Sequence, residues 1–470
     1  MEPYSYRPLR PREIRMLVVR PGQGAEPLQC QLRYRLFNPP DKIPEFEALS
    51  YVWGTRLDAE KISVINNKRS RSLGSVSIGQ NLAVALHRLR LKDKPRTLWC
   101  DSVCINQGDL AEREEQILRM GDIFTYAARV VVWLGPEADG SSLALQTLSH
   151  LGRQVVIDFY KLTIRPVAGA DRFAGSKIQP PLSLQEWETI RALVSREWYG
   201  RLWVWQEIAL ANSEALIICG DVQAKWKEVV GGAFCIATPT RELPKGWDDR
   251  VIAEFVADTQ RLWGLIALQK RRCYLTIADL VYYTRHCHCS VAHDRVYALL
   301  GLLDKAHKLS VKPNYTETPK DLYRSIVTSQ LENYKVLDFL ELCEVDQNPS
   351  WAADIRQLRY RPARWPYSFA SSEAVAVFKA TGNKLEVRGI HCGLVPSSTT
   401  YELVACDAFS IQRVVGDLSR DLLGHVLDDW DIESVRALCD TLFDTKIKDA
   451  GSLIRFDEAL QILKKMGRWL

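Results

Sequence analysis

Charged side chains stand among aromatic ones in the segment Glu197–Ala211. The segment holds three tryptophans and one tyrosine together with Arg201 and Glu207. On a helix, Trp203 and Glu207 are four residues apart and share a face. A carboxylate among aromatic rings costs free energy to bury unless it is paired. Glu207 therefore either forms an ion pair with Arg201 or Arg196, or remains available to a ligand, and the residues alone leave both alternatives open.

A second group of polar side chains follows the β-prone run Thr97–Cys100. Asp101, Asn106 and Gln107 come after this run, at the point where an open parallel sheet places its ligand site. They are therefore candidates for ligand binding. The side chains of Asp101 and Asn106 are also expected to hydrogen-bond to nearby backbone groups and so to shape the turn.

A third candidate lies at the carboxyl end of the apolar run Phe46–Gly54. Tyr51, Trp53 and Gly54 either pack in the core or form a site loop beside Asp101. The loop is favoured because both turns follow strands that are expected to be parallel. Right-handed connections bring the ends of such strands to one rim of the sheet, so the two turns are expected side by side.

These residues are positioned by a strand, a turn, a helix and a second strand over Thr97–Gly135. The first strand and Val130–Leu134 lack polar alternation, which predicts burial on both faces. Asp109 stands three residues before Glu112, the spacing typical of a helix start. The helix then presents one apolar stripe to the sheet, made of Ile117, Met120, Phe124 and Ala127. The pattern predicts a βαβ unit.

The sequence thus predicts an α/β fold, with a mainly parallel sheet flanked by helices over residues 45–235. Residues 1–44 are assigned to an N-terminal arm. Residues 236–470 are assigned to a mostly helical region with a small β-hairpin at Val377–Ile390. Within residues 45–235, Ile62–Leu73 is expected to form another hairpin, and Asn81 is expected to cap a helix.

Composition argues against several classes of protein. The chain has 470 residues, of which 47% are apolar and 25% charged, and this is ordinary for a soluble globular protein. A net charge of +5, without clusters of basic and aromatic residues, argues against a nucleic-acid partner. No apolar run is long enough for a membrane span. Twelve scattered cysteines, and an N-terminus without the apolar core of a secretory signal, predict reduced thiols and a cytoplasmic location.

Common catalytic signatures are missing, including the phosphate-binding loop, GxGxxG, GxSxG and HExxH. One short segment is rich in residue types that ligate metals: His286, Cys287, His288, Cys289 and His293. Neighbours on an extended chain point to opposite sides, which disfavours four ligands converging on one zinc ion. A structural turn before a helix that begins at Asp294 is favoured, with no metal.

Five separated blocks of the sequence match one family in order. They are ALSYVWG (Ala48–Gly54), LWCDSVCINQ (Leu98–Gln107) with the ER pair Glu112 and Arg113, VVVWLG (Val130–Gly135), RLWVWQE (Arg201–Glu207), and CG before a tryptophan (Cys219, Gly220, Trp226). In these blocks the chain resembles the fungal heterokaryon incompatibility (HET) domain, which would cover roughly Glu45–Ala211. The segment DRVYALLGL (Asp294–Leu302) also looks like one usual downstream in this family. The departures are Asp101-Ser102, where the family more often has Asp-Ala, and Ala352-Ala353-Asp354 in place of Val-Pro-Asp-Trp.

The resemblance implies a role in non-self recognition between fungal strains, with activation leading to growth arrest or programmed cell death. The family has been compared with TIR domains, whose flavodoxin-like, doubly wound sheet agrees with the predicted βαβ unit. Some TIR domains cleave NAD with a glutamate four residues after a tryptophan, and Trp203 and Glu207 have that spacing.

Two classes of function therefore stay open. In the first, Glu207 is the catalytic residue of an NAD glycohydrolase, with NAD as substrate and no resident cofactor. Trp203 then supplies an apolar wall, Tyr51 and Trp53 stack on a ring of the ligand, and Arg201 meets a phosphate. In the second class, the domain is a non-catalytic signalling module that self-associates and recruits a death effector. Protein partners in incompatibility signalling are expected in both.

Overall fold

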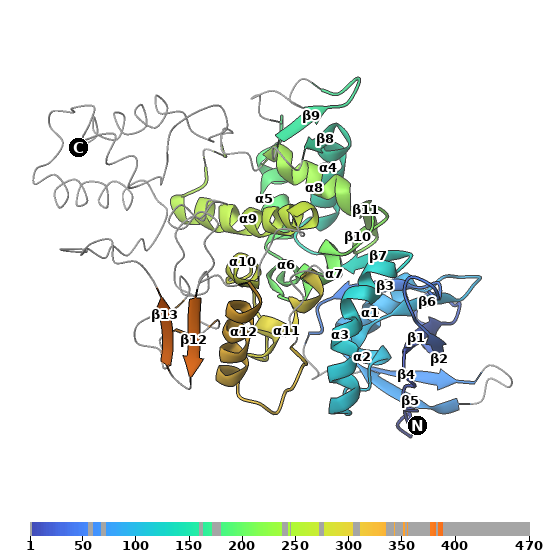
Figure 1. Cartoon of the computed structure of the whole chain (residues 1–470). Helices are drawn as coiled ribbons and strands as arrows, with labels where there is room; N and C mark the ends of the chain where they lie inside the picture. The colour runs from blue at the N-terminus through green and yellow to red at the C-terminus, as the bar shows by residue number, and fades with distance from the viewer. Residues whose placement is uncertain are drawn as a thin grey trace, which may run out of the picture. The chain divides into compact units, whose positions relative to one another are not determined.

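A computed structural model describes residues 2–54, 60–66, 72–158, 163–171, 180–236, 243–244, 246–271, 277–303, 311–334, 343, 351–352, 355, 377–381 and 384–388 (Figure 1). The first of two compact units runs from Met1 to Arg388, and the boundary predicted near residue 235 falls inside it. None of the helices in the described part of the chain combines the length and apolar character that crossing a bilayer requires.

The centre of this unit is a nine-stranded mixed sheet with the order β11-β10-β7-β3-β6-β1-β2-β4-β5. Its strands are β1 (Glu13–Val19), β2 (Gln29–Leu36), β3 (Glu47–Tyr51), β4 (Glu60–Ile65), β5 (Ser72–Ile78), β6 (Arg96–Trp99), β7 (Arg129–Trp133), β10 (Leu216–Cys219) and β11 (Val222–Lys225). The four neighbours β10, β7, β3 and β6 are parallel. The mainly parallel prediction holds for this central part, but β1, β5 and β11 pair only in the antiparallel sense.

The predicted βαβ unit is present as β6, helix α3 (Leu110–Tyr126) and β7. Asp109 caps α3 by accepting a hydrogen bond of 3.1 Å from the backbone N–H of Glu112. The two strands are not neighbours, because β3 lies between them and pairs with both. The expected turn after β6 contains a short helix, α2 (Asp101–Cys104), so that part of the prediction was wrong.

The residues assigned to an N-terminal arm contribute two strands to the sheet. β1 pairs with β2 on one side and with β6 on the other, both antiparallel. Its residues Ile14–Val19 are all buried, including Arg15. The segment before residue 45 therefore shares the core of the parallel strands.

β4 and β5 form the expected antiparallel hairpin, although residues 67–71 of its turn lie outside the described residues. Helix α1 (Gln80–Leu89) begins after Gly79, so the prediction that Asn81 caps this helix was wrong. The amide of Asn81 instead donates to the carbonyl oxygen of Val52, at 2.6 Å, and accepts from the indole of Trp133, at 3.0 Å. Asn81 thereby links the ends of β3 and β7.

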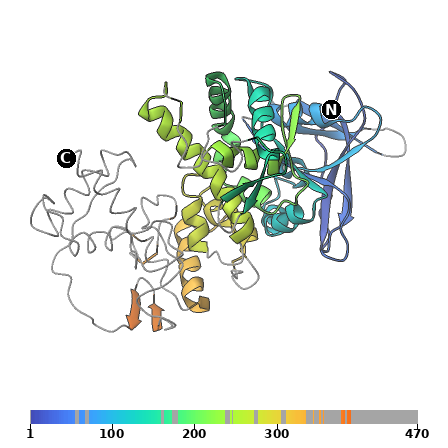
Figure 2. The same ribbon diagram turned by 90° about the horizontal axis from the view of Figure 1, so that it is seen from above.

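Helices pack beside the parallel strands and continue beyond them. They are α4 (Ser141–Arg153), α5 (Leu184–Val194), α6 (Glu197–Gly200), α7 (Val204–Ala209), α8 (Trp226–Ile236), α9 (Asp249–Arg271), α10 (Ile277–Tyr283), α11 (Asp294–Tyr297), the 3-10 turn η2 (Leu300–Leu302) and α12 (Pro319–Tyr334). Helix α9 contacts α5, α7 and α8, and Figure 1 shows it beside α5 and α8. Figure 2 shows the same arrangement of helices and sheet from above. Two small hairpins, β8 (Val155–Asp158) with β9 (Thr163–Pro166) and β12 (Val377–Thr381) with β13 (Lys384–Arg388), are separate from the large sheet. The second is the hairpin predicted at Val377–Ile390.

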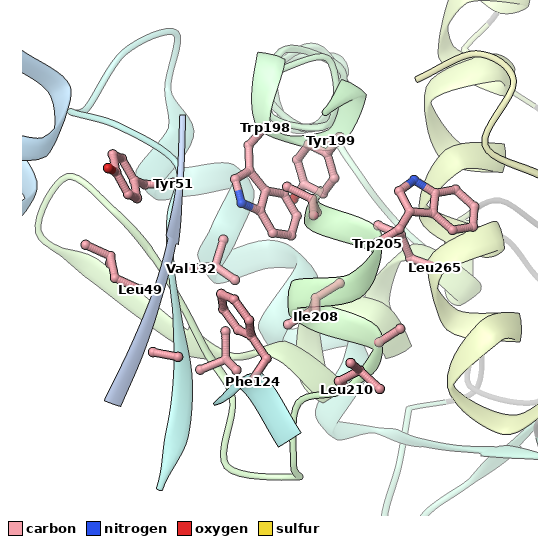
Figure 3. Packing of buried hydrophobic residues seen from close by; sticks show 14 of the residues in the cluster. Leu49, Tyr51, Phe124, Val132, Trp198, Tyr199, Trp205, Ile208, Leu210 and Leu265 are labelled. Atoms are coloured by element: carbon pink, nitrogen blue, oxygen red, sulfur yellow. The ribbon is translucent and has the colours of Figure 1, made fainter. Parts of the chain in front are cut away.

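Aromatic residues of α6 and α7 fill the core between the sheet and α9 (Figure 3). Trp198, Tyr199 and Trp205 are at most 1% exposed. The rings of Trp198 and Tyr199 meet edge to face, with 5.0 Å between their centroids. This packing fixes the short segment that carries Arg201 and Glu207.

Candidate functional site

The carboxylate of Glu207 is held in the core by a serine. Glu207 lies on α7 and is 3% exposed, and its Oε2 accepts a hydrogen bond from the hydroxyl of Ser50 on β3. Ser50 Oγ accepts in turn from the indole N–H of Trp198, at 2.8 Å. Ser50 is 1% exposed and Trp198 is fully buried. A chain of two hydrogen bonds thus leads from α6 through β3 to the glutamate.

Asp101 lies at the start of α2, two residues after the end of β6, and its side chain meets the turn that follows β3. Its Oδ2 accepts from the indole of Trp53 at 2.8 Å, and its Oδ1 accepts from the backbone N–H of Ser102 at 2.7 Å. The hydroxyls of Tyr51 and Ser102 are 2.6 Å apart. The prediction that these two turns lie side by side at one rim of the sheet is confirmed.

The positive charge of Arg201 acts on the carboxyl groups of both Asp101 and Glu207, but Arg201 forms a salt bridge with neither. Its Nη1 donates to the carbonyl oxygen of Tyr51. Among the described residues, no lysine or arginine nitrogen forms a salt bridge within 4.0 Å of Glu207. Arg196, the other proposed partner, donates instead to backbone oxygens of Leu134 and Pro136. The ion-pair alternative for Glu207 is therefore not what the structure contains.

Burial raises the pKa of Glu207 from an ordinary value of 4.5 to about 7. The positive charge of Arg201 lowers this pKa, the negative charge of Asp101 raises it, and the hydrogen bond from Ser50 lowers it again. Burial also raises the pKa of Asp101, against the opposing effects of Arg201 and the Trp53 hydrogen bond. A carboxyl group with a pKa near neutrality can exchange a proton or stabilise a positive charge at physiological pH.

Comparison with known sequences identifies the domain that contains these residues. The family model described as Heterokaryon incompatibility protein (HET) matches residues 46–207. The chain contains a HET domain. "Heterokaryon incompatibility protein 6, OR allele" of Neurospora crassa is 29% identical over 339 residues, which cover 64% of this chain and 49% of the relative. The chain thus spans about half the length of that curated relative. No solved structure matches the chain significantly.

All of the predicted site residues lie within the matched HET domain, but the structure does not bring all of them together. Hydrogen bonds connect Arg201 with Tyr51 and Trp53 with Asp101. Glu207 is bonded to Ser50, the residue before Tyr51. Gln107 joins them, because its amide donates to the carbonyl oxygen of Asp101 at 3.0 Å.

The remaining predicted residues of the HET domain have other surroundings. Gly54 has a φ of +69°, a left-handed conformation that favours glycine, and it is exposed. Asn106 accepts from the N–H of Gly108 at 3.3 Å, and its own N–H donates to Glu112 at 2.7 Å. The expected local hydrogen bonds of Asp101 and Asn106 are thus confirmed. Both residues shape the loop after β6.

Trp203, four residues before Glu207, contacts a different helix. Its indole donates at 3.1 Å to Asp294 on α11, which lies outside the matched HET domain. The hydroxyl of Tyr315 donates to the other oxygen of Asp294, at 2.8 Å. Arg113 of the ER pair stacks over the ring of Tyr315 at 4.2 Å. Trp203 therefore ties the HET domain to the DRVY segment.

Sequence reasoning missed Ser50, Ser102 and Trp198. Ser50 was detectable, because a serine inside the apolar run Phe46–Gly54 needs a buried hydrogen-bond partner. Neither Ser102 nor Trp198 carried such a signal.

The segment rich in histidine and cysteine has a structural contact with the HET domain. The backbone of His288 bridges to Arg201, through bonds of 2.7 Å to the carbonyl oxygen of Gly200 and 3.0 Å from the N–H of Leu202. Cys287 is buried. Over the residues that the structure describes, no group of three or more His, Cys, Asp or Glu side chains could hold a metal ion.

The opposite edge of the parallel strands contains a groove of about 700 Å³. Glu47, the first residue of β3, forms salt bridges there with Arg96 of β6 and Arg129 of β7. Burial works against ionisation of Glu47, but the hydrogen bonds and charges of the two arginines lower its pKa below the ordinary value. This groove is remote from Glu207, because it lies at the amino ends of the strands.

Proposed function

We propose that this HET domain protein is an effector of fungal non-self recognition that causes growth arrest or cell death by cleaving NAD at the bond between nicotinamide and ribose. The observation that carries the proposal is the carboxylate of Glu207, which is buried at the carboxyl edge of parallel strands and has no salt bridge to any residue that the structure describes. Such an edge is where open α/β sheets bind ligands. The four parallel strands support a TIR-like arrangement for this part of the sheet.

In this reaction the N-glycosidic bond breaks, nicotinamide leaves with the bonding electrons, and the oxygen of water bonds to the ribose carbon. The products are ADP-ribose, nicotinamide and a proton. Positive charge develops on the ribose during cleavage, as in glycoside hydrolysis, and an ionised Glu207 stabilises it. A dry site strengthens that interaction.

The neighbours of Glu207 have supporting roles in the proposal. Arg201 uses one donor on the carbonyl oxygen of Tyr51 and can present others to a phosphate. Trp53 can offer its ring face to the ligand while its N–H remains on Asp101. Trp203 can likewise supply an apolar wall with its ring while its N–H remains on Asp294.

In this proposal, the enzyme is activated in the cytoplasm by self-association and by protein partners. An effector that is active at rest would kill its own cell. The enzyme is therefore expected to need a high local concentration, and catalysis is to be measured across a concentration series.

The test compares the wild type, Glu207→Gln and the control Glu214→Gln, a change of an exposed glutamate at the other edge. Purified protein is incubated with NAD, nicotinamide release is followed by chromatography, and NAD content and death are scored in fungal cells expressing each form. The wild type and Glu214→Gln should release nicotinamide and kill, and a folded Glu207→Gln should do neither. Killing by Glu207→Gln with NAD unchanged would identify a non-catalytic module that recruits another effector.

A further inference from the structure

We propose that Ser50 is a positioning residue for Glu207, that its hydroxyl orients the carboxylate, and that Trp198 holds Ser50 in turn. The inference rests on the proposed function of Glu207 and assigns to β3 a part in that function. Ser50 is a polar residue in a buried part of β3, where its neighbours Ala48, Leu49 and Tyr51 are mostly apolar. Packing of the strand alone does not call for a hydroxyl at this position.

The direction of the two hydrogen bonds follows from the chemistry of the groups. An indole N–H can only donate, so Ser50 Oγ must be the acceptor in its 2.8 Å contact with Trp198. A hydroxyl has a single hydrogen, and that hydrogen is then free to point at Glu207 Oε2. Trp198 thus fixes which way Ser50 donates, and Ser50 fixes one oxygen of the carboxylate.

A bond donated to a carboxylate favours its ionised form. Three other influences act on Glu207: burial and the charge of Asp101 on α2 favour the protonated form, and the charge of Arg201, just before α7, favours the ionised form. Ser50 contributes the direct hydrogen bond from β3. Loss of its hydroxyl should therefore leave Glu207 protonated to a higher pH.

A merely structural role for Ser50 would give a different result. A serine that only satisfies its own buried hydroxyl would, when replaced, change the stability of the protein equally at every pH. A serine that acts on Glu207 changes the pH at which Glu207 ionises. The pH dependence, and not the size of the stability change, separates the two.

The variants are Ser50→Ala, which removes the donor, and Trp198→Phe, which keeps a ring and removes only the indole N–H. Tyr199→Phe is the matched control, because the neighbouring Tyr199 is equally buried and its hydroxyl has no hydrogen-bond partner within the described part of the chain. Each variant is made with and without Glu207→Gln. The free energy of unfolding in urea is measured from pH 5 to 9 for both members of each pair. The difference between the two members gives the pH at which Glu207 ionises in that variant, with no need for activity.

Ser50→Ala should raise the pH at which Glu207 ionises by on the order of one unit. The pH profile of nicotinamide release should shift in the same direction, so that the rate falls about tenfold on the acidic side and recovers at higher pH. Trp198→Phe should give a smaller shift of the same sign, and it provides the test if Ser50→Ala does not fold. Tyr199→Phe should give none.

An unchanged ionisation of Glu207 in both folded variants would overturn the role of Ser50, even in a protein that cleaves NAD. Conversely, a wild type that releases no nicotinamide at any concentration would overturn the proposed function. The unfolding data would still decide whether Ser50 sets the ionisation of Glu207.

Discussion

Glu47 and Glu207 lie at opposite edges of the parallel strands and have opposite electrostatic surroundings. Two arginines meet Glu47, and its pKa is lowered despite partial burial. Over the described ranges of the chain, the hydroxyl of Ser50 is the side-chain group that bonds to Glu207, and burial raises the pKa of Glu207 to about 7. The amino edge thus keeps its carboxylate charged for stability. The carboxyl edge keeps a carboxyl group whose charge can change.

Glu112, like Glu47, is paired with arginine. It lies near the carboxyl edge, accepts from the N–H of Asn106, and binds Arg15 through both oxygens at 2.8 and 3.2 Å. Arg15 is fully buried. Glu112 is therefore a structural carboxylate near the carboxyl group that we propose as catalytic.

Glu112→Gln should have the largest effect on stability among the carboxylate changes. It leaves the guanidinium of Arg15 buried without a counter-charge, which costs about 3–5 kcal/mol. Urea unfolding at pH 7 measures the loss, with the exposed Glu115→Gln on the same helix as the control. If Glu112→Gln were no more harmful than Glu115→Gln, the distinction between paired and unpaired carboxylates would be wrong.

The stability of Glu207→Gln relative to the wild type should increase as the pH rises. The folded protein keeps a proton on Glu207 between pH 4.5 and about 7 while the unfolded chain has lost it, so the wild type loses unfolding free energy over this range. The loss is about 3 kcal/mol, and the glutamine variant escapes it. The two proteins are compared by unfolding at pH 5, 6, 7 and 8, and a difference that stays constant would contradict the raised pKa.

Glu47→Gln should respond to acid in the opposite sense. The pKa of Glu47 is lowered in the folded protein. Ionised Glu47 therefore adds to the free energy of unfolding above the unfolded-state pKa, and this addition is lost as the pH falls through the folded-state pKa. At pH 7 the change should cost about 2 kcal/mol, since Arg129 is partly exposed and only Arg96 loses a buried partner. Thermal melting at pH 7 and pH 3 checks both the size and the sign.

Trp53→Phe should have the smallest effect. It removes the 2.8 Å hydrogen bond to Asp101 and keeps an aromatic ring, which should cost about 1 kcal/mol. Because that bond favours ionised Asp101, the variant should lose stability at pH 7 and much less at pH 4. Equal losses at both values would show that Trp53 acts only through packing.

The local pattern of the sequence was enough to predict the central unit of the fold. Asp109 with Glu112, and the apolar runs on either side, specify the cap, α3, β6 and β7 by short-range chemistry. The same patterns carry no information on which strands are neighbours, so the insertion of β3 between β6 and β7 was not predicted. Asn81 failed as a cap for the same reason, because its partners are residues distant in sequence.

The candidate site was predicted in part. Tyr51, Trp53, Asp101 and Gln107 come together because parallel strands end at one rim, which the βαβ pattern implies. Arg201 and Glu207 come from the segment around α6 and α7, and their place beside β3 depends on packing distant in sequence. Helical spacing relates Trp203 to Glu207, and the backbone N–H of Glu207 does bond to the carbonyl oxygen of Trp203, but the spacing does not predict that the indole binds Asp294. A partner 91 residues away is beyond what spacing can predict.

The place of β1 in the sheet has a consequence for dividing this chain. The match to the HET family begins at residue 46, yet β1 covers the edge of β6 over Leu17–Val19. A fragment cut at residue 46 would expose the unpaired backbone of β6 and leave Glu112 without Arg15. Such a fragment is expected to aggregate during expression. A transplant of this domain into another protein, or a search for natural recombination breakpoints, should therefore treat the residues from Glu13 onward as inseparable from it.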